Sequence, residues 1–538
     1  MSVRNVAAAI LEQLSAWGVT KVYGFIGDDI FYLLDAIAHQ SEISFYQVRH
    51  EESAALMASA HAKLTGQPGV CIADGGPGTL HLLNGLADAF TDKAPVIAIT
   101  GQVARAQIGT NAKQYVNQQL LMSGLSVYSD IAADPKAVIK VMGLAYRSAV
   151  SNMSVAHISV PMDVFSMPCE ERALPLPPYL TNHPQSSQNV MDGAAEKINK
   201  AERPVVLVGR GGQKAGKLIN ELASGCGAGI VTTMSGMGVV DKSHPLYTGG
   251  LGHAGSPAST AVLAKSDLCI IVGANWWPTK YVPQNIPAIE IDINPANMGS
   301  SPQGAYGVVG DSSAVLSYIV KRLEPKNNIQ WRELIQSEIG NWMNILQQET
   351  TTDGTPIHPA VVIKAIEKTV PQDAVLCLDT GDNTVWFGRI FRPARQRILL
   401  SGKWRTMGFG LPAAISAKIN YPEQKVVAIV GDGGFSMTMA DLITAVKYNL
   451  PIVVVVLNNN SLAMEKNKMQ AGNLVPEGTS LLNHDFAGFA KICGADGIYV
   501  EEAEQLEEAL TTALNSSKPV VVDVRTSSVP VPGTAMPG

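Results

Sequence analysis

Short apolar runs recur along this chain and alternate with helix-length segments of periodic hydrophobicity. Six such runs are Gly69–Ala73, Val96–Thr100, Pro204–Val208, Gly229–Thr233, Leu268–Val272 and Ala288–Ile293. A strand that is apolar along its whole length has to be covered on both faces, as strands in parallel sheets are. The alternation therefore predicts an α/β protein built from doubly wound parallel sheets.

Breaks in this alternation predict how the chain divides. Its 538 residues exceed the size of one usual domain. The stretch 172–189 is rich in Pro, Ser and Asn, and two further polar or turn-rich stretches occupy 324–328 and 350–359. These breaks predict three domains, with residues 1–172, 190–325 and 355–530.

Composition excludes several classes of protein. The net charge of −6 is spread without a basic stripe, which argues against nucleic-acid binding. No run of about eighteen apolar residues occurs, so we expect no transmembrane helix. The six cysteines are far apart and form no C-x-x-C pair, as is typical of a reducing compartment. We therefore expect a cytoplasmic protein that is not recruited to a membrane.

Two strand ends in the last domain carry oxygen ligands for a hard cation. The glycine turn Gly431–Gly434 contains Asp432, a helix is predicted over Met437–Asn449, and the next apolar run, Pro451–Leu457, leads to Asn459. Backbone N–H groups of such a turn can approach a phosphate. A carboxylate and an amide carbonyl at neighbouring strand ends can bind a Mg²⁺ ion that also holds a diphosphate. Either strand end alone would be ordinary in an α/β protein, but the two together predict a site for Mg²⁺ and a diphosphate.

This motif, GDG followed about thirty residues later by NN, resembles the thiamine-diphosphate motif. Further segments resemble the pyruvate oxidase and acetolactate synthase branch, with the pyruvate oxidases closer. They are VRHEE at 48–52, AERPVVLVGRGGQKAG at 201–216, IDINPANMG at 291–299 and GFGLPAAISAKINYPE at 408–423. The resemblance covers nearly the whole chain. It implies an N-terminal pyrimidine-binding domain, a central FAD-type domain and a C-terminal domain for the diphosphate and Mg²⁺.

The resemblance also implies roles for residues of the N-terminal domain. Glu51 matches the carboxyl group that exchanges a proton with N1′ of the cofactor's aminopyrimidine. Gly78 and Asn84 match the loop beside that ring. His81 in the same loop is either an active-site donor or a structural histidine. Glu52 is expected to be structural.

The substrate pocket departs from the family pattern at two places. Where related oxidases and synthases have Phe-Gln-Glu, this chain has Lys113-Gln114-Tyr115, which retains only the candidate catalytic residue Gln114. Met407 matches the bulky apolar side chain that lies between the two cofactor rings. There it would hold the reacting groups of the two rings close together. Two residues before it, Arg405 replaces a small residue. Lys113 either binds an acidic substrate or phosphate or lies in solvent.

Further residues are assigned to cofactors by the resemblance alone. The backbone carbonyl of Ser461 is the expected third metal ligand beside Asp432 and Asn459. The expected diphosphate contacts are Gly431, Gly433, Gly434, Ser461, Leu462, Ala463 and Met464, and the candidate FAD contacts are Gly209, Arg210, Gly211, Gly273, Asp292 and Asp311. Glu465 either faces substrate or caps the next helix. Since glycine-rich turns after strands are common, a middle domain without FAD stays a second possibility.

The implied reaction is thiamine-diphosphate- and Mg²⁺-dependent decarboxylation of a 2-keto acid, most readily pyruvate, with oxidation of the two-carbon product through FAD. An acetolactate synthase-like carboligase and a non-oxidative decarboxylase are the alternatives. The presence of Glu51, Asp432 and Asn459 argues against a non-catalytic homologue. Because family members complete the site across two subunits, we expect a homodimer at minimum and more readily a homotetramer.

Overall fold

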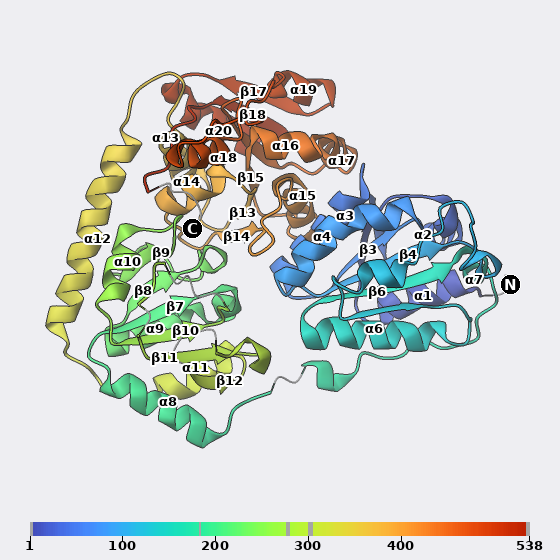
Figure 1. Cartoon of the computed structure of the whole chain (residues 1–538), viewed down its shortest axis with the longest axis horizontal. Coiled ribbons are helices and arrows are strands. Elements are labelled where there is room, and N and C mark those ends of the chain that lie inside the picture. Colours follow the sequence, from blue (N-terminus) through green and yellow to red (C-terminus); the bar gives the residue numbers. More distant parts are fainter. Residues whose placement is uncertain (1–3, 182–183, 276–279, 284, 300–304, 534–538) are drawn as a thin grey trace.

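Three parallel six-stranded sheets form the framework of the protein (Figure 1). The computed structural model describes residues 4–181, 184–275, 280–283, 285–299 and 305–533. Every pairing between neighbouring strands in this part of the chain is parallel. The predicted α/β class with doubly wound parallel sheets is confirmed.

The first sheet has the strand order β2-β1-β3-β4-β6-β5. Its strands are β1 (Lys21–Gly24), β2 (Ser44–Gln47), β3 (Gly69–Ala73), β4 (Val96–Gln102), β5 (Tyr128–Ile131) and β6 (Val155–Pro161). Its helices are α1 (Val6–Ala16), α2 (Phe31–Ala38), α3 (Glu51–Thr65), α4 (Pro77–Thr91), α5 (Gln118–Met122), α6 (Val138–Asn152) and α7 (Met162–Phe165). Apolar side chains of α3 and α4 join one buried cluster, and those of α1 and α6 join another. Helices therefore cover both faces of the sheet, as apolar strands require.

The second sheet has the order β12-β11-β10-β7-β8-β9. Its strands are β7 (Pro204–Val208), β8 (Gly229–Thr232), β9 (Tyr247–Gly250), β10 (Leu268–Val272), β11 (Ala288–Asp292) and β12 (Ala305–Val309). Its helices are α8 (Gln188–Lys200), α9 (Gly216–Cys226), α10 (Pro257–Ala264) and α11 (Ser312–Val320). The 22-residue helix α12 (Ile329–Thr350) then runs along the outside of the molecule towards the third sheet (Figure 1).

The third sheet has the order β14-β13-β15-β16-β18-β17. Its strands are β13 (Val375–Leu378), β14 (Arg397–Leu400), β15 (Val426–Gly431), β16 (Val453–Asn458), β17 (Asp496–Val500) and β18 (Val520–Arg525). Its helices are α13 (Pro359–Thr369), α14 (Asp382–Ile390), α15 (Gly410–Asn420), α16 (Asp432–Thr438), α17 (Leu442–Lys447), α18 (Ala463–Ala471), α19 (Phe486–Ile492) and α20 (Leu506–Asn515). The helix predicted from Met437 is wrong at its start, because α16 already begins at Asp432.

The three sheets fall within the three predicted domain ranges. Among its described residues, the stretch 172–189 contains a 3₁₀ turn and the first residues of α8. The boundaries themselves stay predictions. In the part of the chain that the structure describes, no helix combines the length and apolar content needed to cross a bilayer.

The first and third sheets share one core. Helix α3 packs on α15, and a single hydrophobic cluster contains buried residues of both, such as Met57 and Leu411. Ser416 Oγ also donates a hydrogen bond of 2.8 Å to the carbonyl of Met57. This contact fixes the N-terminal domain against the C-terminal domain of the same chain.

A buried ion cluster joins all three domains. Lys63 Nζ lies 2.7 Å from Asp88 Oδ2 and 2.6 Å from Asp92 Oδ2, and the lysine side chain is 2% exposed. The Asp92 carboxylate also accepts both backbone N–H groups at 402–403, each at 2.7 Å. The side chain of Arg210 donates to the backbone carbonyl of Asp92. Asp92 thus contacts the central domain and the loop that leads to Met407.

Replacing Lys63 by methionine is expected to destabilise the protein by about 3–5 kcal/mol, because two buried carboxylates lose their cation. The measurement is the melting temperature, with Lys200→Met as the matched control. Lys200 pairs with Glu196, but both side chains are largely exposed, so no measurable change is expected there. Equal melting temperatures for the two variants would contradict a stabilising role for the cluster.

Candidate active site

Asp432 is the first residue of α16 and is 3% exposed. Its carboxylate oxygen Oδ2 accepts hydrogen bonds from the backbone N–H groups of Asn459 (3.1 Å) and Ser461 (3.3 Å), and Oδ1 accepts from that of Gly433 (2.9 Å). Strands β15 and β16 are neighbours with Gly431 paired to Leu457, so their ends meet as the sequence predicted. Burial raises the pKa of Asp432, and these hydrogen bonds oppose the shift.

Asn483 supports this strand end, and it was not predicted from the sequence. Its Nδ2 donates to Asp432 Oδ2 at 2.7 Å and to Asn458 Oδ1 at 2.8 Å. Asn458 in turn donates to Asp523 Oδ1 at 3.0 Å. The side-chain carbonyl of the second asparagine of the pair, Asn459, lies at the same strand end and accepts the N–H of Ser461 at 3.1 Å.

Met407 lies against the glycine turn. A Cβ atom built on Gly433 would come within 2.7 Å of Leu462 Cδ2 and 3.1 Å of Met407 Cε, so only glycine leaves room there. Asp379, a further residue that was not predicted, holds the turn that follows Met407. Its carboxylate accepts the N–H groups of Gly408 at 2.9 Å and Gly410 at 3.1 Å. Burial raises the pKa of Asp379 to about 6.

The segment after Asn459 leads into α18. The N–H of Leu462 donates to the carbonyl of Thr479 at 2.8 Å, and Ala463 and Met464 form the first turn of the helix. Glu465 also lies in this first turn and forms an ion pair of 3.1 Å with Lys468. This geometry favours the helix-end role for Glu465 over a contact with substrate.

A second group of predicted residues converges in the N-terminal domain. Glu51 is the first residue of α3 and is 8% exposed. His81 Nδ1 donates to Glu51 Oε2 at 2.9 Å, and a Cβ atom on Gly78 would lie 3.3 Å from Glu51 Oε1. Gly76, at φ +51°, would bring a Cβ within 2.4 Å of the Gln114 carbonyl. The structure thus places Glu51, Gly78, His81 and the backbone of Gln114 around one loop.

Three family profiles of thiamine pyrophosphate enzymes match this chain. The N-terminal TPP binding domain matches residues 4–121, the central domain 191–319 and the C-terminal TPP binding domain 379–524. A pyruvate oxidase of Lactiplantibacillus plantarum is 31% identical over 98% of this chain and 89% of its own length. The chain belongs to the thiamine-diphosphate-dependent enzyme family.

Other relatives of this thiamine-diphosphate enzyme include a Bacillus subtilis protein described as thiamine pyrophosphate-containing, YdaP. It is 38% identical over 99% of this chain and 94% of its own length. The large subunit of acetolactate synthase isozyme 2 of Escherichia coli is 30% identical over 97% and 95% of the two chains. The relatives thus span oxidases and carboligases.

The two groups of site residues of this enzyme come from different domains of the chain. Among the residues that the structure describes, no hydrogen bond or ion pair links Glu51 or His81 to Met407, Asp432 or Asn459. Instead, Asn84 connects residues of the N-terminal and C-terminal domains. Its Nδ2 donates to Glu52 Oε1 and to Thr406 Oγ1, and its Oδ1 accepts from Trp404 Nε1.

The donor set fits the family's cofactor. The carboxylate of Asp432, the amide carbonyl of Asn459 and the backbone carbonyl of Ser461 are oxygen ligands of the kind that Mg²⁺ takes beside a diphosphate. The N–H groups of Asn459 and Ser461 both donate to Asp432 Oδ2, which places these three residues at one strand end. These residues would hold the metal beside the first turn of α16.

The central domain brings some of its predicted residues together. Gly209, Gly273 and Asp292 lie at the carboxyl ends of the adjacent strands β7, β10 and β11. The N–H of Gly211 donates to the carbonyl of Gly273 at 3.0 Å, so these glycines allow close contact between two loops. Asp311 caps α11 through the N–H groups at 313–314.

The departures at Arg405 and Lys113 lie on the surface of the described chain. Both side chains are exposed, and neither forms a hydrogen bond or ion pair with another described residue. Arg405 adopts φ +55°, a left-handed conformation that is costly for a residue with a Cβ atom. Both departures therefore add an exposed positive charge.

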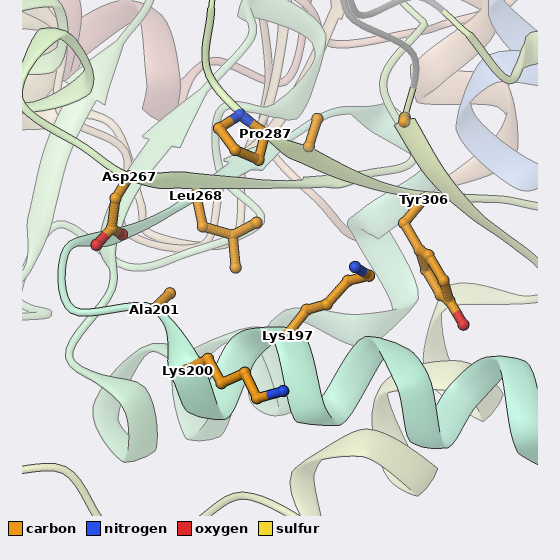
Figure 2. Close-up of a pocket in the computed structure, with 9 residues that line it drawn as sticks. Lys197, Lys200, Ala201, Asp267, Leu268, Pro287 and Tyr306 are labelled. Atoms are coloured by element: carbon orange, nitrogen blue, oxygen red, sulfur yellow. The ribbon is translucent and has the colours of Figure 1, made fainter.

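A hollow of about 610 Å³ lies away from this site. Figure 2 shows Lys197 and Lys200 of α8 beside Leu268 and Tyr306. These residues surround the amino ends of β10, β11 and β12, opposite the carboxyl ends where α/β proteins bind cofactors. Lys197 lies 5.1 Å from the Tyr306 ring centroid and packs as a cation–π pair. This hollow is not the cofactor site.

Proposed function

We propose that this enzyme decarboxylates a 2-keto acid, pyruvate in the first instance, and oxidises the two-carbon product through FAD. The observation that carries the proposal is the Glu51–His81 pair of the N-terminal domain together with the Asp432–Asn459 strand end of the C-terminal domain. The 31% identity to a pyruvate oxidase favours oxidation as the outcome. The adjacent strand ends at Gly209, Gly273 and Asp292 support FAD binding.

When bound, thiamine diphosphate supplies the electron sink for decarboxylation. The Glu51 carboxyl holds and exchanges a proton at the pyrimidine ring, and the Nδ1–H of His81 orients its Oε2. Met407 shapes the cofactor at the glycine turn, where Asp379 fixes the backbone on its C-terminal side.

We propose that the smallest active unit is a homodimer. The likeness of this chain to family members favours a homotetramer. A second subunit is proposed because members of the resembling family complete the site across two subunits. Large apolar side chains stay exposed beside both groups, among them Leu80 (41%), Trp404 (44%) and Met437 (64%). Such surface is typical of a subunit contact. A cytoplasmic location is also proposed, and six free cysteines support it.

The visible absorption spectrum of the purified protein, recorded before and after anaerobic addition of pyruvate, tests this function. We expect a flavin band that bleaches as pyruvate is consumed. A colourless protein that still releases acetaldehyde would contradict the oxidase and indicate a simple decarboxylase. A flavin band that persists while acetolactate accumulates would favour the carboligase, which the 30% identity to an acetolactate synthase keeps as the second candidate.

A further inference from the structure

A second hollow opens in the C-terminal domain, on the side of Asn459 that faces away from the glycine turn. Its volume is about 490 Å³. It is formed by the Asn459–Asn460 turn, one side of α18 and the segment that follows β18. The lining includes Asn467, Arg525 and Thr526. Asn459, the proposed metal ligand, lines it, whereas Gly433, Leu462 and Met407 do not, so the hollow adjoins the proposed metal site on the β18 side of β16.

Two buried polar groups in this lining have no partner. Asn467 is 5% exposed and Thr526 is 3% exposed. Neither Asn467 Nδ2 nor Thr526 Oγ1 forms a hydrogen bond within the described chain. Buried polar groups are satisfied in the large majority of cases, so two unsatisfied ones on one hollow indicate a missing ligand. An amide N–H and a hydroxyl can both donate to it.

The charges around the hollow indicate the sign of that ligand. Arg525 is exposed at the hollow, and its guanidinium has no hydrogen bond or ion pair among the described residues. Lys466 Nζ reaches the same segment and donates to Ser528 Oγ at 3.0 Å. No Asp or Glu belongs to the lining, and the nearby Asp523 carboxylate is already bonded to Asn458 and the N–H of Phe486. The site therefore offers donors and positive charge.

We propose that this hollow binds the oxyanion group of a small metabolite, a phosphate or a carboxylate, through Asn467 Nδ2, Thr526 Oγ1 and the Arg525 guanidinium. Arginine and neutral donors together are well suited to such a group. The volume exceeds that of a bare oxyanion, and Pro356 and Val529 in the lining provide apolar contact for an organic body. The three proposed donors, Asn467, Thr526 and Arg525, are not among the residues assigned to catalysis, so the proposal does not depend on the proposed reaction.

Isothermal titration of the protein saturated with thiamine diphosphate and Mg²⁺ tests the proposal, because the diphosphate surface is then filled. The probes are inorganic phosphate, glycerol 3-phosphate and acetate. We expect one site per chain and an affinity that falls about tenfold to a hundredfold in Thr526→Val, which removes one hydrogen bond to a charged group. Arg525→Gln should weaken binding in the same direction. Thr511→Val is the matched control, since Thr511 bonds to its own helix on the surface.

Thr526→Val should fold as well as the parent, since it replaces an unsatisfied hydroxyl by a methyl group. Its melting temperature without probe checks this. Tighter binding of glycerol 3-phosphate than of inorganic phosphate would support an organic phosphate as the ligand, and binding of acetate alone would support a carboxylate. The proposal is overturned if none of the three probes binds, or if binding is equal in the parent, Thr526→Val and Arg525→Gln.

Discussion

Turnover of pyruvate is expected to fall by about 10²- to 10⁴-fold when Glu51 is replaced by glutamine, the range typical for loss of a general acid–base group. Glutamine keeps the shape of the side chain and can still accept the hydrogen bond that His81 Nδ1 donates to Glu51 Oε2. It cannot exchange a proton with the pyrimidine ring. Thiamine diphosphate binding should therefore be retained, which a tryptophan fluorescence titration measures beside steady-state turnover.

Glu52→Gln is the matched control for this experiment. Glu52 is the next residue of α3, and its Oε1 accepts a hydrogen bond of 2.6 Å from Asn84 Nδ2. The amide oxygen of glutamine can accept the same hydrogen bond. We expect turnover close to that of the parent. Full activity of Glu51→Gln, or equal losses in both variants, would show that Glu51 is not the proton-exchanging group.

Asp432→Asn is expected to weaken Mg²⁺-dependent binding of thiamine diphosphate by at least about a hundredfold. The substitution removes a charged metal ligand, and loss even of a supporting partner of a ligand typically costs 10- to 100-fold. The fold should persist, because an asparagine carbonyl can accept the N–H groups of Asn459 and Ser461 that now bond to the carboxylate. Calorimetric titration after removal of metal by a chelator gives the affinity.

Two further variants sharpen this result. Asn483→Ala removes the amide that donates to Asp432 Oδ2 and should weaken cofactor binding by about 10- to 100-fold. Asp485→Asn changes an aspartate of the same domain that caps α19, where asparagine is an equally good cap, and should leave binding unchanged. Parental affinity in Asp432→Asn at the same Mg²⁺ concentration would be incompatible with its role as a metal ligand.

Much of the framework was predictable because the central strands are apolar throughout. The runs at 69–73, 204–208 and 268–272 coincide with β3, β7 and β10. The start of α16 was predicted too late because Gly433 and Gly434 look like turn residues. In the structure they continue the helix, and Leu462 and Asp379 pack where a Cβ atom would stand.

The supporting residues of the site were harder to predict than its motifs. Asp379 follows the apolar run 375–378, so the rule that polar side chains at strand ends meet could have identified it. Asn483 lies in a segment without periodicity, and only the folded chain brings it to Asp432. No sequence signal marks such a single residue. The FAD contacts also stay predictions, because glycines at loop crossings are needed with or without a ligand.

The position of Asp92 has a practical consequence for mutagenesis of the central domain. Arg210 binds the carbonyl of Asp92, whose carboxylate holds the loop at 402–403, a few residues before Met407. We therefore expect a change at Arg210 to disturb the loop that leads to Met407, whatever its effect on flavin binding. Kinetic defects of such variants should be assigned to electron transfer only after thiamine diphosphate affinity has been measured in the same protein.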